Sequence, residues 1–120
     1  MTILKIEPGK HPVTAEIDGS LESLQQMVGG YIQAVYPFED PVAVVCNDDG
    51  KLLGLEPNRC LCDDHGKIYD VLVGTFFICG IKGENFASLP ENLLRKYSEF
   101  FKSPECFINT PDGLFVFPLV

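Results

Sequence analysis

Alternation of hydrophobic and polar residues predicts most of the strands in this chain. Residues 2–6 and 13–17 alternate in polarity and are separated by Glu7-Pro8-Gly9-Lys10. A side-chain period of two is that of a half-buried strand, and proline and glycine favour a turn between two strands. Residues 42–46 are instead almost uniformly apolar, which is typical of a strand covered on both faces. Further strands are predicted at residues 31–36, 51–55, 68–81 with an interruption at Gly74, 106–109 and 114–117.

Turn residues join several of these strands into hairpins. Asp49-Gly50 is favoured in tight hairpin loops that need positive φ, so residues 51–55 are predicted to be a strand returning from residues 42–46. Pro111-Asp112-Gly113 predicts a last hairpin near the end of the chain, because each of these residues favours a turn. Two stretches without a regular pattern are predicted to be irregular: residues 56–66 and 82–87.

Two helices are predicted from apolar positions at helical spacing. The first follows Ser20, which can cap it, carries Leu21, Leu24 and Val28 on one face, and ends at Gly29-Gly30. The second begins at the capping box Ser88-Leu89-Pro90-Glu91 and runs to about Lys102. Its apolar face is expected to contain Leu93, Leu94, Tyr97, Phe100 and Phe101.

The count of about eight short strands and two helices predicts an α+β fold with a mainly antiparallel, curved sheet. A length of 120 residues with 46% hydrophobic content fits one globular domain, residues 1–120. We see neither a signal peptide nor a membrane-spanning run, so we expect a cytoplasmic protein. The five cysteines are then expected to be reduced thiols.

The formal charge is 9 − 17 = −8. This acidic balance argues against binding to a nucleic-acid backbone or to anionic lipid, both of which need clustered basic residues.

Six short motifs resemble one family of short proteins of unknown function. They are Gly29-Gly30-Tyr31-Ile32, Asn47-Asp48-Asp49-Gly50-Lys51-Leu52, Gly54-Leu55, Asn58-Arg59, Tyr69-Asp70 and Gly74-Thr75-Phe76-Phe77-Ile78. The resemblance covers about residues 3 to 117. That family occurs in phages, plasmids and integrative conjugative elements of Gram-positive gut bacteria, often encoded near antirestriction genes. The resemblance implies a setting, mobile DNA, and supplies neither an activity nor catalytic or binding residues.

The stretch RCLCDDHG, residues 59–66, raises the question of a metal site or a reactive thiol. Cys60 and Cys62 share a face of an extended strand, but their Cα atoms would be about 6.6 Å apart, so a bulge or turn would have to bring both sulfurs to one zinc ion. His65 could be a third ligand. The fourth would have to be one of four residues that no spacing singles out: Cys46, Cys79, Cys106 or His11. We therefore favour small hydrophobic cysteines and a solvated histidine, and predict neither a metal nor a cofactor.

A cysteine nucleophile would need a nearby cation. Arg59 is adjacent in sequence, but Asp63 and Asp64 oppose its effect, and we identify no group that would orient His65 as a base.

Asn58-Arg59 is the strongest polar candidate for ligand binding. An arginine on a loop can hold a carboxylate or phosphate with two hydrogen bonds; the alternative is a local salt bridge to Glu56, Asp63 or Asp64. A small ligand such as a nucleotide would lie beside the strand that follows. The predicted ligand-binding residues are Asn58, Arg59, Tyr69, Asp70, Gly74 and Thr75.

Three acidic doublets allow two interpretations: Glu39-Asp40, Asp48-Asp49 and Asp63-Asp64. They are solvated turns, or they form a carboxylate array that imitates DNA phosphates. The second interpretation requires the acids to lie on one face, because −8 spread over a whole domain is much sparser than the charge on duplex DNA.

The function expected from these observations is a non-catalytic accessory protein that acts by binding. A protein partner is favoured, because an acidic surface steers basic partners toward it. A small-ligand module comes second, and an enzyme third, because the sequence supplies no complete catalytic triad, dyad or metal-ligand set. The nine phenylalanines are expected to lie mainly in the core.

Overall fold

The centre of the fold is a six-stranded sheet in which every pairing is antiparallel. The computed structural model describes residues 1–119. The strand order is β2-β1-β7-β4-β3, and β8 also pairs with β7. The strands are β1 (Thr2–Ile6), β2 (Val13–Glu16), β3 (Ile32–Val35), β4 (Val42–Asn47), β7 (Phe76–Lys82) and β8 (Asn85–Ala87). This architecture confirms the predicted α+β class.

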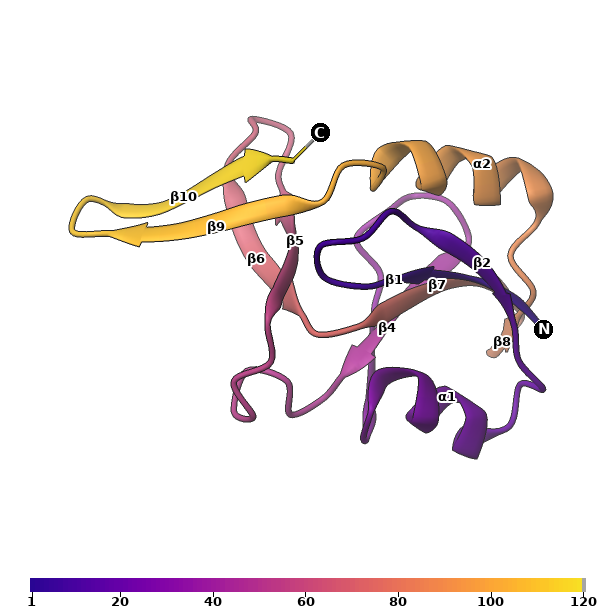
Figure 1. The fold of residues 1–120 in the computed structure, drawn as a ribbon. Coiled ribbons are helices and arrows are strands. Elements are labelled where there is room, and N and C mark those ends of the chain that lie inside the picture. Colours follow the sequence, from indigo (N-terminus) through magenta and orange to yellow (C-terminus); the bar gives the residue numbers. More distant parts are fainter. Residues whose placement is uncertain (120) are drawn as a thin grey trace.

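Both faces of this sheet are covered, by helices on opposite sides (Figure 1). Helix α1 (Leu21–Val28) contributes Leu24 and Val28 to one core. Helix α2 (Glu91–Phe100) and the two-stranded sheet of β5 (Pro57–Cys62) and β6 (Ile68–Val73) cover the other face. Strand β4 alternates between the two cores and is buried along its whole length, which confirms a strand covered on both faces.

The first helix begins and ends as the sequence predicts. The Ser20 hydroxyl accepts a hydrogen bond from the Ser23 amide at 3.1 Å, and Gly29 closes the helix with a φ of 79°.

The predicted capping box of the second helix is wrong. Pro90 is the N-cap of α2, and its ring has no acceptor for a capping hydrogen bond. The Ser88 hydroxyl instead accepts the amide of Thr2 in β1 at 2.9 Å. In the predicted apolar face, Leu93, Tyr97 and Phe101 are buried, whereas Phe100 is exposed.

Three other predictions between residues 48 and 87 are corrected by the structure. Residues 51–55 form turns instead of a returning strand, since Leu53 and Leu55 donate to the carbonyls of Asp49 and Gly50. Strand β4 pairs with β3 and β7 instead. The stretch predicted to be irregular, 56–66, contains β5, and the predicted loop at 82–87 contains β8.

The predicted last hairpin is confirmed as β9 (Glu105–Thr110) and β10 (Gly113–Pro118). We call this hairpin, residues 105–118, the arm. It extends away from the central sheet beyond β5 and β6 (Figure 1), and contributes to a shape of 44 × 29 × 24 Å. At its base the Glu105 carboxylate accepts the amide of Cys60 at 2.7 Å. No helix within residues 1–119 is long and apolar enough to span a membrane.

Candidate functional site

Asn58 lies in the interior, on strand β5 and not on a loop as the sequence analysis assumed. Its side-chain amide donates to the carbonyl of Ile6 at 2.9 Å and to that of Gly74 at 2.8 Å. These two bonds connect the end of β1 to the turn between β6 and β7. Both amide hydrogens of Asn58 are therefore committed to the backbone of the fold.

Arg59 is also buried, with only 1% of its surface exposed. Its guanidinium donates to the carbonyl of Phe101 at 3.0 and 3.2 Å, to that of Lys10 at 2.7 Å, and to the Asn58 side-chain oxygen at 2.8 Å. Burial lowers the pKa of Arg59, and the charge of Glu105 opposes this shift. The expected salt bridge to Glu56, Asp63 or Asp64 is not among the ion pairs of the described chain. Arg59 instead holds the end of α2 against the β1–β2 turn.

Of the other predicted ligand-binding residues, Gly74 is buried and contacts Asn58 through its carbonyl, whereas Tyr69, Asp70 and Thr75 do not surround this contact. Tyr69 is exposed and borders a hollow beside Tyr36 and Leu61, whereas Gly74 and Thr75 border a different one beside Leu55. The structure does not bring the six predicted residues together in one cavity.

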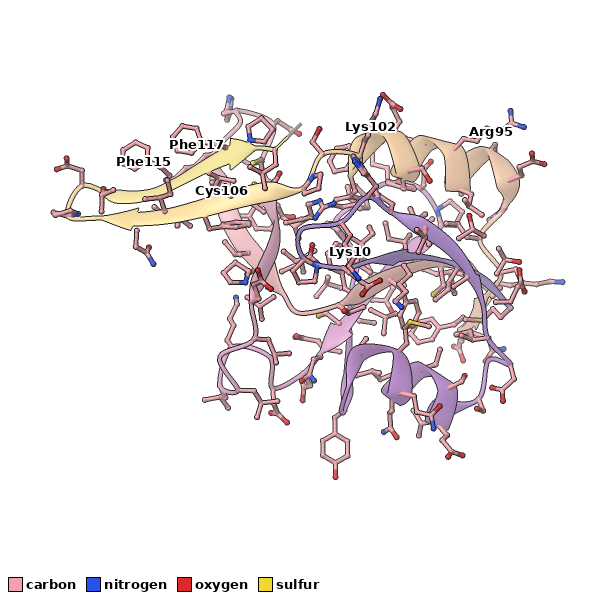
Figure 2. All side chains as sticks on the ribbon, viewed as in Figure 1. Lys10, Arg95, Lys102, Cys106, Phe115 and Phe117 are labelled. Carbon is pink, nitrogen blue, oxygen red and sulfur yellow. The ribbon has the colours of Figure 1, made fainter. Side chains whose placement is uncertain are left out.

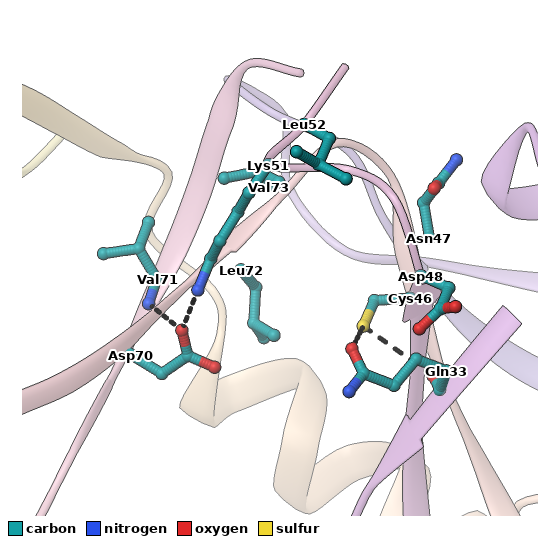
Figure 3. Close-up of a pocket in the computed structure, with 10 residues that line it drawn as sticks. All are labelled: Gln33, Cys46, Asn47, Asp48, Lys51, Leu52, Asp70, Val71, Leu72 and Val73. Atoms are coloured by element: carbon teal, nitrogen blue, oxygen red, sulfur yellow. Dashed lines mark hydrogen bonds and ion pairs between the residues drawn. The ribbon is translucent and has the colours of Figure 1, made fainter. Parts of the chain in front are cut away.

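A partly enclosed hollow lies between β3, β4 and β6 and contains Asp70 (Figure 3). Asp70 accepts a hydrogen bond from Lys51 at 2.6 Å, and this ion pair closes one side. On the other side, the thiol of Cys46 lies 3.7 Å from the carbonyl of Gln33, and burial raises its pKa. The enclosed volume is about 120 Å³, well below the roughly 300 Å³ at which small-molecule sites begin. The hollow is too small to enclose a nucleotide.

Several residues of the family-like motifs serve to build this corner of the fold. The Asn47 side chain donates to the carbonyl of Val28 at the end of α1 and accepts the amide of Asp49. A Cβ on Gly30 would lie 2.9 Å from the Asn47 amide nitrogen, and one on Gly50 would lie 2.8 Å from Val73. These motif residues have a packing role, and their presence does not by itself mark a ligand site.

The acidic doublets are spread over three separate loops. Asp40 accepts from Lys96 at 2.6 Å and from Tyr97 at 2.7 Å, and these hydrogen bonds lower its pKa. Asp63 accepts the amides of His65 and Lys67 within the β5–β6 turn. Asp48-Asp49 follows β4 at the hollow described above. Glu39-Asp40 and Asp48-Asp49 therefore lie at opposite ends of β4, and Asp63-Asp64 lies in the turn of a different sheet. This separation does not support the imitation of DNA, which requires the acids to lie on one face.

The thiols of Cys60 and Cys62 lie together on β5. Their sulfur atoms are 3.8 Å apart. Burial, followed by the charge of Glu105, raises the pKa of Cys60 to about 12. This thiol is therefore protonated at neutral pH and is a poor nucleophile. His65 does not join it, since no group of three or more metal-ligating side chains forms within residues 1–119.

The arm carries a face that the sequence analysis missed. The register opposes Ile108 to Phe115 and Cys106 to Phe117, and residues that face each other across antiparallel strands lie on the same side of the ribbon. Phe115, Phe117 and Ile108 are 46%, 50% and 45% exposed, and both phenylalanine rings point away from the central sheet (Figure 2). We call these four residues the outer face of the arm. The expectation that the phenylalanines lie mainly in the core fails here.

A sequence signal for this face did exist. Strands 106–109 and 114–117 carry apolar residues on both sides of the ribbon, and the only charge between Cys106 and Phe117 is Asp112 in the turn. Natural sheet edges usually carry charges that discourage pairing with other chains.

Comparison with known proteins places residues 1–102 within one family model, described as a domain of unknown function (DUF3846). The matched segment ends just before β9, so the arm lies outside it. No curated protein matches the chain, and no solved structure does. Because the model covers far more than half of the sequence, the chain belongs to the DUF3846 family.

Proposed function

We propose that this chain is a non-catalytic binding protein whose arm docks onto a partner protein. The observation that supports the proposal is the outer face of the arm, where Ile108, Phe115 and Phe117 are about half exposed and no charged side chain lies among them. Exposed apolar patches of this kind mark interaction sites in soluble proteins.

The energetics favour an occupied arm. An isolated two-stranded hairpin is at most marginally stable in water. Burying the exposed halves of Ile108, Phe115 and Phe117 would contribute about 1 kcal/mol each, half of the value for complete burial. The sum of about 3 kcal/mol corresponds to roughly a 100-fold gain in affinity.

The expected partner presents an apolar groove bordered by basic residues. The net charge of −8 attracts a basic protein over long range. The acidic residues therefore guide the partner toward the protein, and the docking face itself need not be acidic. The outer strand edges of the arm offer backbone groups to which an extended segment of the partner could add.

The rest of the proposal concerns setting and chemistry. The family resemblance supports an accessory role in a mobile genetic element. The raised pKa values of the Cys60 and Cys79 thiols, each about 12 and each caused mainly by burial, support binding over thiol catalysis. A nucleotide-binding role for Asn58 and Arg59 has less support, because their donors contact backbone and neighbouring side-chain oxygens.

The test is quantitative capture from a lysate of the natural host cells. The bait is the whole chain, compared with the double variant Phe115→Ser, Phe117→Ser. The matched control, Leu52→Ser, Leu53→Ser, removes two residues that are at least as exposed but lie on the body. We expect a partner that the wild type and the control retain and that the arm variant loses. Equal retention by all three baits would refute the proposal.

A further inference from the structure

The two cysteines of β5 have their sulfur atoms closer together than an extended strand would place them. Cys60 and Cys62 lie on the same side of the strand, and the register between β5 and β6 shifts between Leu61 and Cys62. Such an irregularity was the condition under which the two sulfurs could approach one ion. The distance between the sulfurs is 3.8 Å.

This separation matches the distance between two sulfur ligands on one tetrahedral ion. Zinc–sulfur bonds of about 2.3 Å at the tetrahedral angle place the two sulfurs about 3.8 Å apart. We propose that Cys60 and Cys62 form a two-thiol site that binds a thiophilic divalent ion of the zinc and cadmium class. The sulfurs need no rearrangement to reach this geometry.

The surroundings of the pair favour a cation. The carboxylate of Glu105 is held beside Cys60 by the Cys60 amide and forms no ion pair within the described chain. A negative charge that discourages ionisation of a lone thiol stabilises a bound cation, which in turn deprotonates its ligands. Arg59, the adjacent cation, is buried and directs its guanidinium to the carbonyls of Phe101 and Lys10.

Access also distinguishes this pair from two of the other cysteines. Cys62 is exposed and Cys60 is partly exposed, whereas Cys46 and Cys79 are buried. The described residues place no third metal-ligating side chain with the pair. Solvent, or the equivalent pair of a second copy, therefore completes the coordination.

The experiment is a titration of the reduced, tag-free protein with Cd²⁺, following the ultraviolet charge-transfer absorption of cadmium–thiolate bonds. We expect the absorption to saturate at one Cd²⁺ per chain, or at one per two chains if a second copy completes the site. Zn²⁺ should compete and remove the band. Cys60→Ser and Cys62→Ser should each reduce the band by at least half and weaken binding at least tenfold.

Two matched variants test the assignment. Cys106→Ser removes another partly exposed thiol, and His65→Ala removes the histidine of the same sequence stretch; both should bind Cd²⁺ as the wild type does. Circular dichroism of each variant checks that it is folded. Absence of a saturable band in the wild type would overturn the proposal, as would a band that keeps more than half of its intensity after loss of either Cys60 or Cys62. So would a band that depends on Cys106 or His65.

Discussion

Replacing Arg59 should destabilise the fold severely. The side chain is almost fully buried and donates to acceptors on three residues that lie far apart in sequence: the carbonyls of Lys10 and Phe101, and both oxygens of Asn58. A hydrogen bond to a charged donor contributes about 1.5 kcal/mol at the lower end. The Arg59→Ala variant leaves the acceptors of three residues without their charged donor, so we expect the free energy of unfolding to fall by about 4 kcal/mol. The total free energy of unfolding of a small domain is about 5–15 kcal/mol.

The assay is equilibrium unfolding in urea at pH 7, followed by far-ultraviolet circular dichroism. The control is Arg95→Ala, which removes an arginine whose side chain is 78% exposed and which, among residues 1–119, pairs with Glu91 alone on the surface of α2. The Arg95→Ala substitution should lower the free energy of unfolding by no more than about 0.5 kcal/mol. Arg59→Lys should still lose about 2 kcal/mol, because a lysine keeps the charge without the planar set of donors that reaches separate acceptors.

The comparison between the two arginine positions is decisive. The dependence of unfolding free energy on urea should be the same for all variants, so that differences in midpoint report stability. An Arg59→Ala variant within about 1 kcal/mol of Arg95→Ala would refute the structural role assigned to this guanidinium. It would also restore Arg59 as a candidate for ligand binding.

Three further predictions concern other positions. Hydrogen bonds from Ser20 lower the pKa of Asp18 to about 2. The stability that the Asp18 carboxylate contributes is therefore complete above its ordinary pKa of 3.8 and is lost as the pH falls toward 2. Carboxyl titration by NMR should find this low pKa, and Ser20→Ala should raise the pKa of Asp18. Gly80→Ala should cost at least about 2 kcal/mol by urea unfolding, since its Cβ would lie 2.5 Å from the backbone oxygen of Ser88, and Lys82→Ala on the same strand should have little effect. Burial raises the pKa of the Cys79 thiol to about 12, so at pH 7 a thiol reagent should modify Cys79 only after unfolding. The exposed Cys62 should be modified first. Rapid modification of Cys79 in the native protein would contradict the packing described.

The sequence predicted those parts of the fold in which the local pattern and the tertiary environment agree. Residues 42–46 are apolar throughout because both faces of β4 are covered. The interruption predicted at Gly74 is the turn between β6 and β7, where Gly74 has a φ of 71°. Strand β5 was missed because Asn58 and Arg59 are polar residues in buried positions, and an alternation rule counts such residues as exposed.

The site predictions failed for related reasons. Asn58-Arg59 was correctly identified as unusual, but whether its hydrogen-bonding groups face a ligand or the backbone depends on residues up to 52 positions away. The predicted capping box did not form because the Ser88 hydroxyl accepts the amide of Thr2, a residue distant in the sequence. The exposure of Phe115 and Phe117 had a local signal, the absence of charges from both strands of the arm, but the phenylalanines were assigned to the core because apolar residues are usually buried.

The pairing of β1 with β7 has a consequence for how the protein is made. Leu4 lies opposite Ile78, a separation of 78 − 4 = 74 residues. During synthesis β1 leaves the ribosome well before β7 and must wait for it, since within the described sheet its other neighbour is β2. Contacts this distant slow folding, and unpaired strands of a nascent chain are prone to aggregate. Truncated chains that stop before residue 76 should therefore associate with chaperones instead of folding.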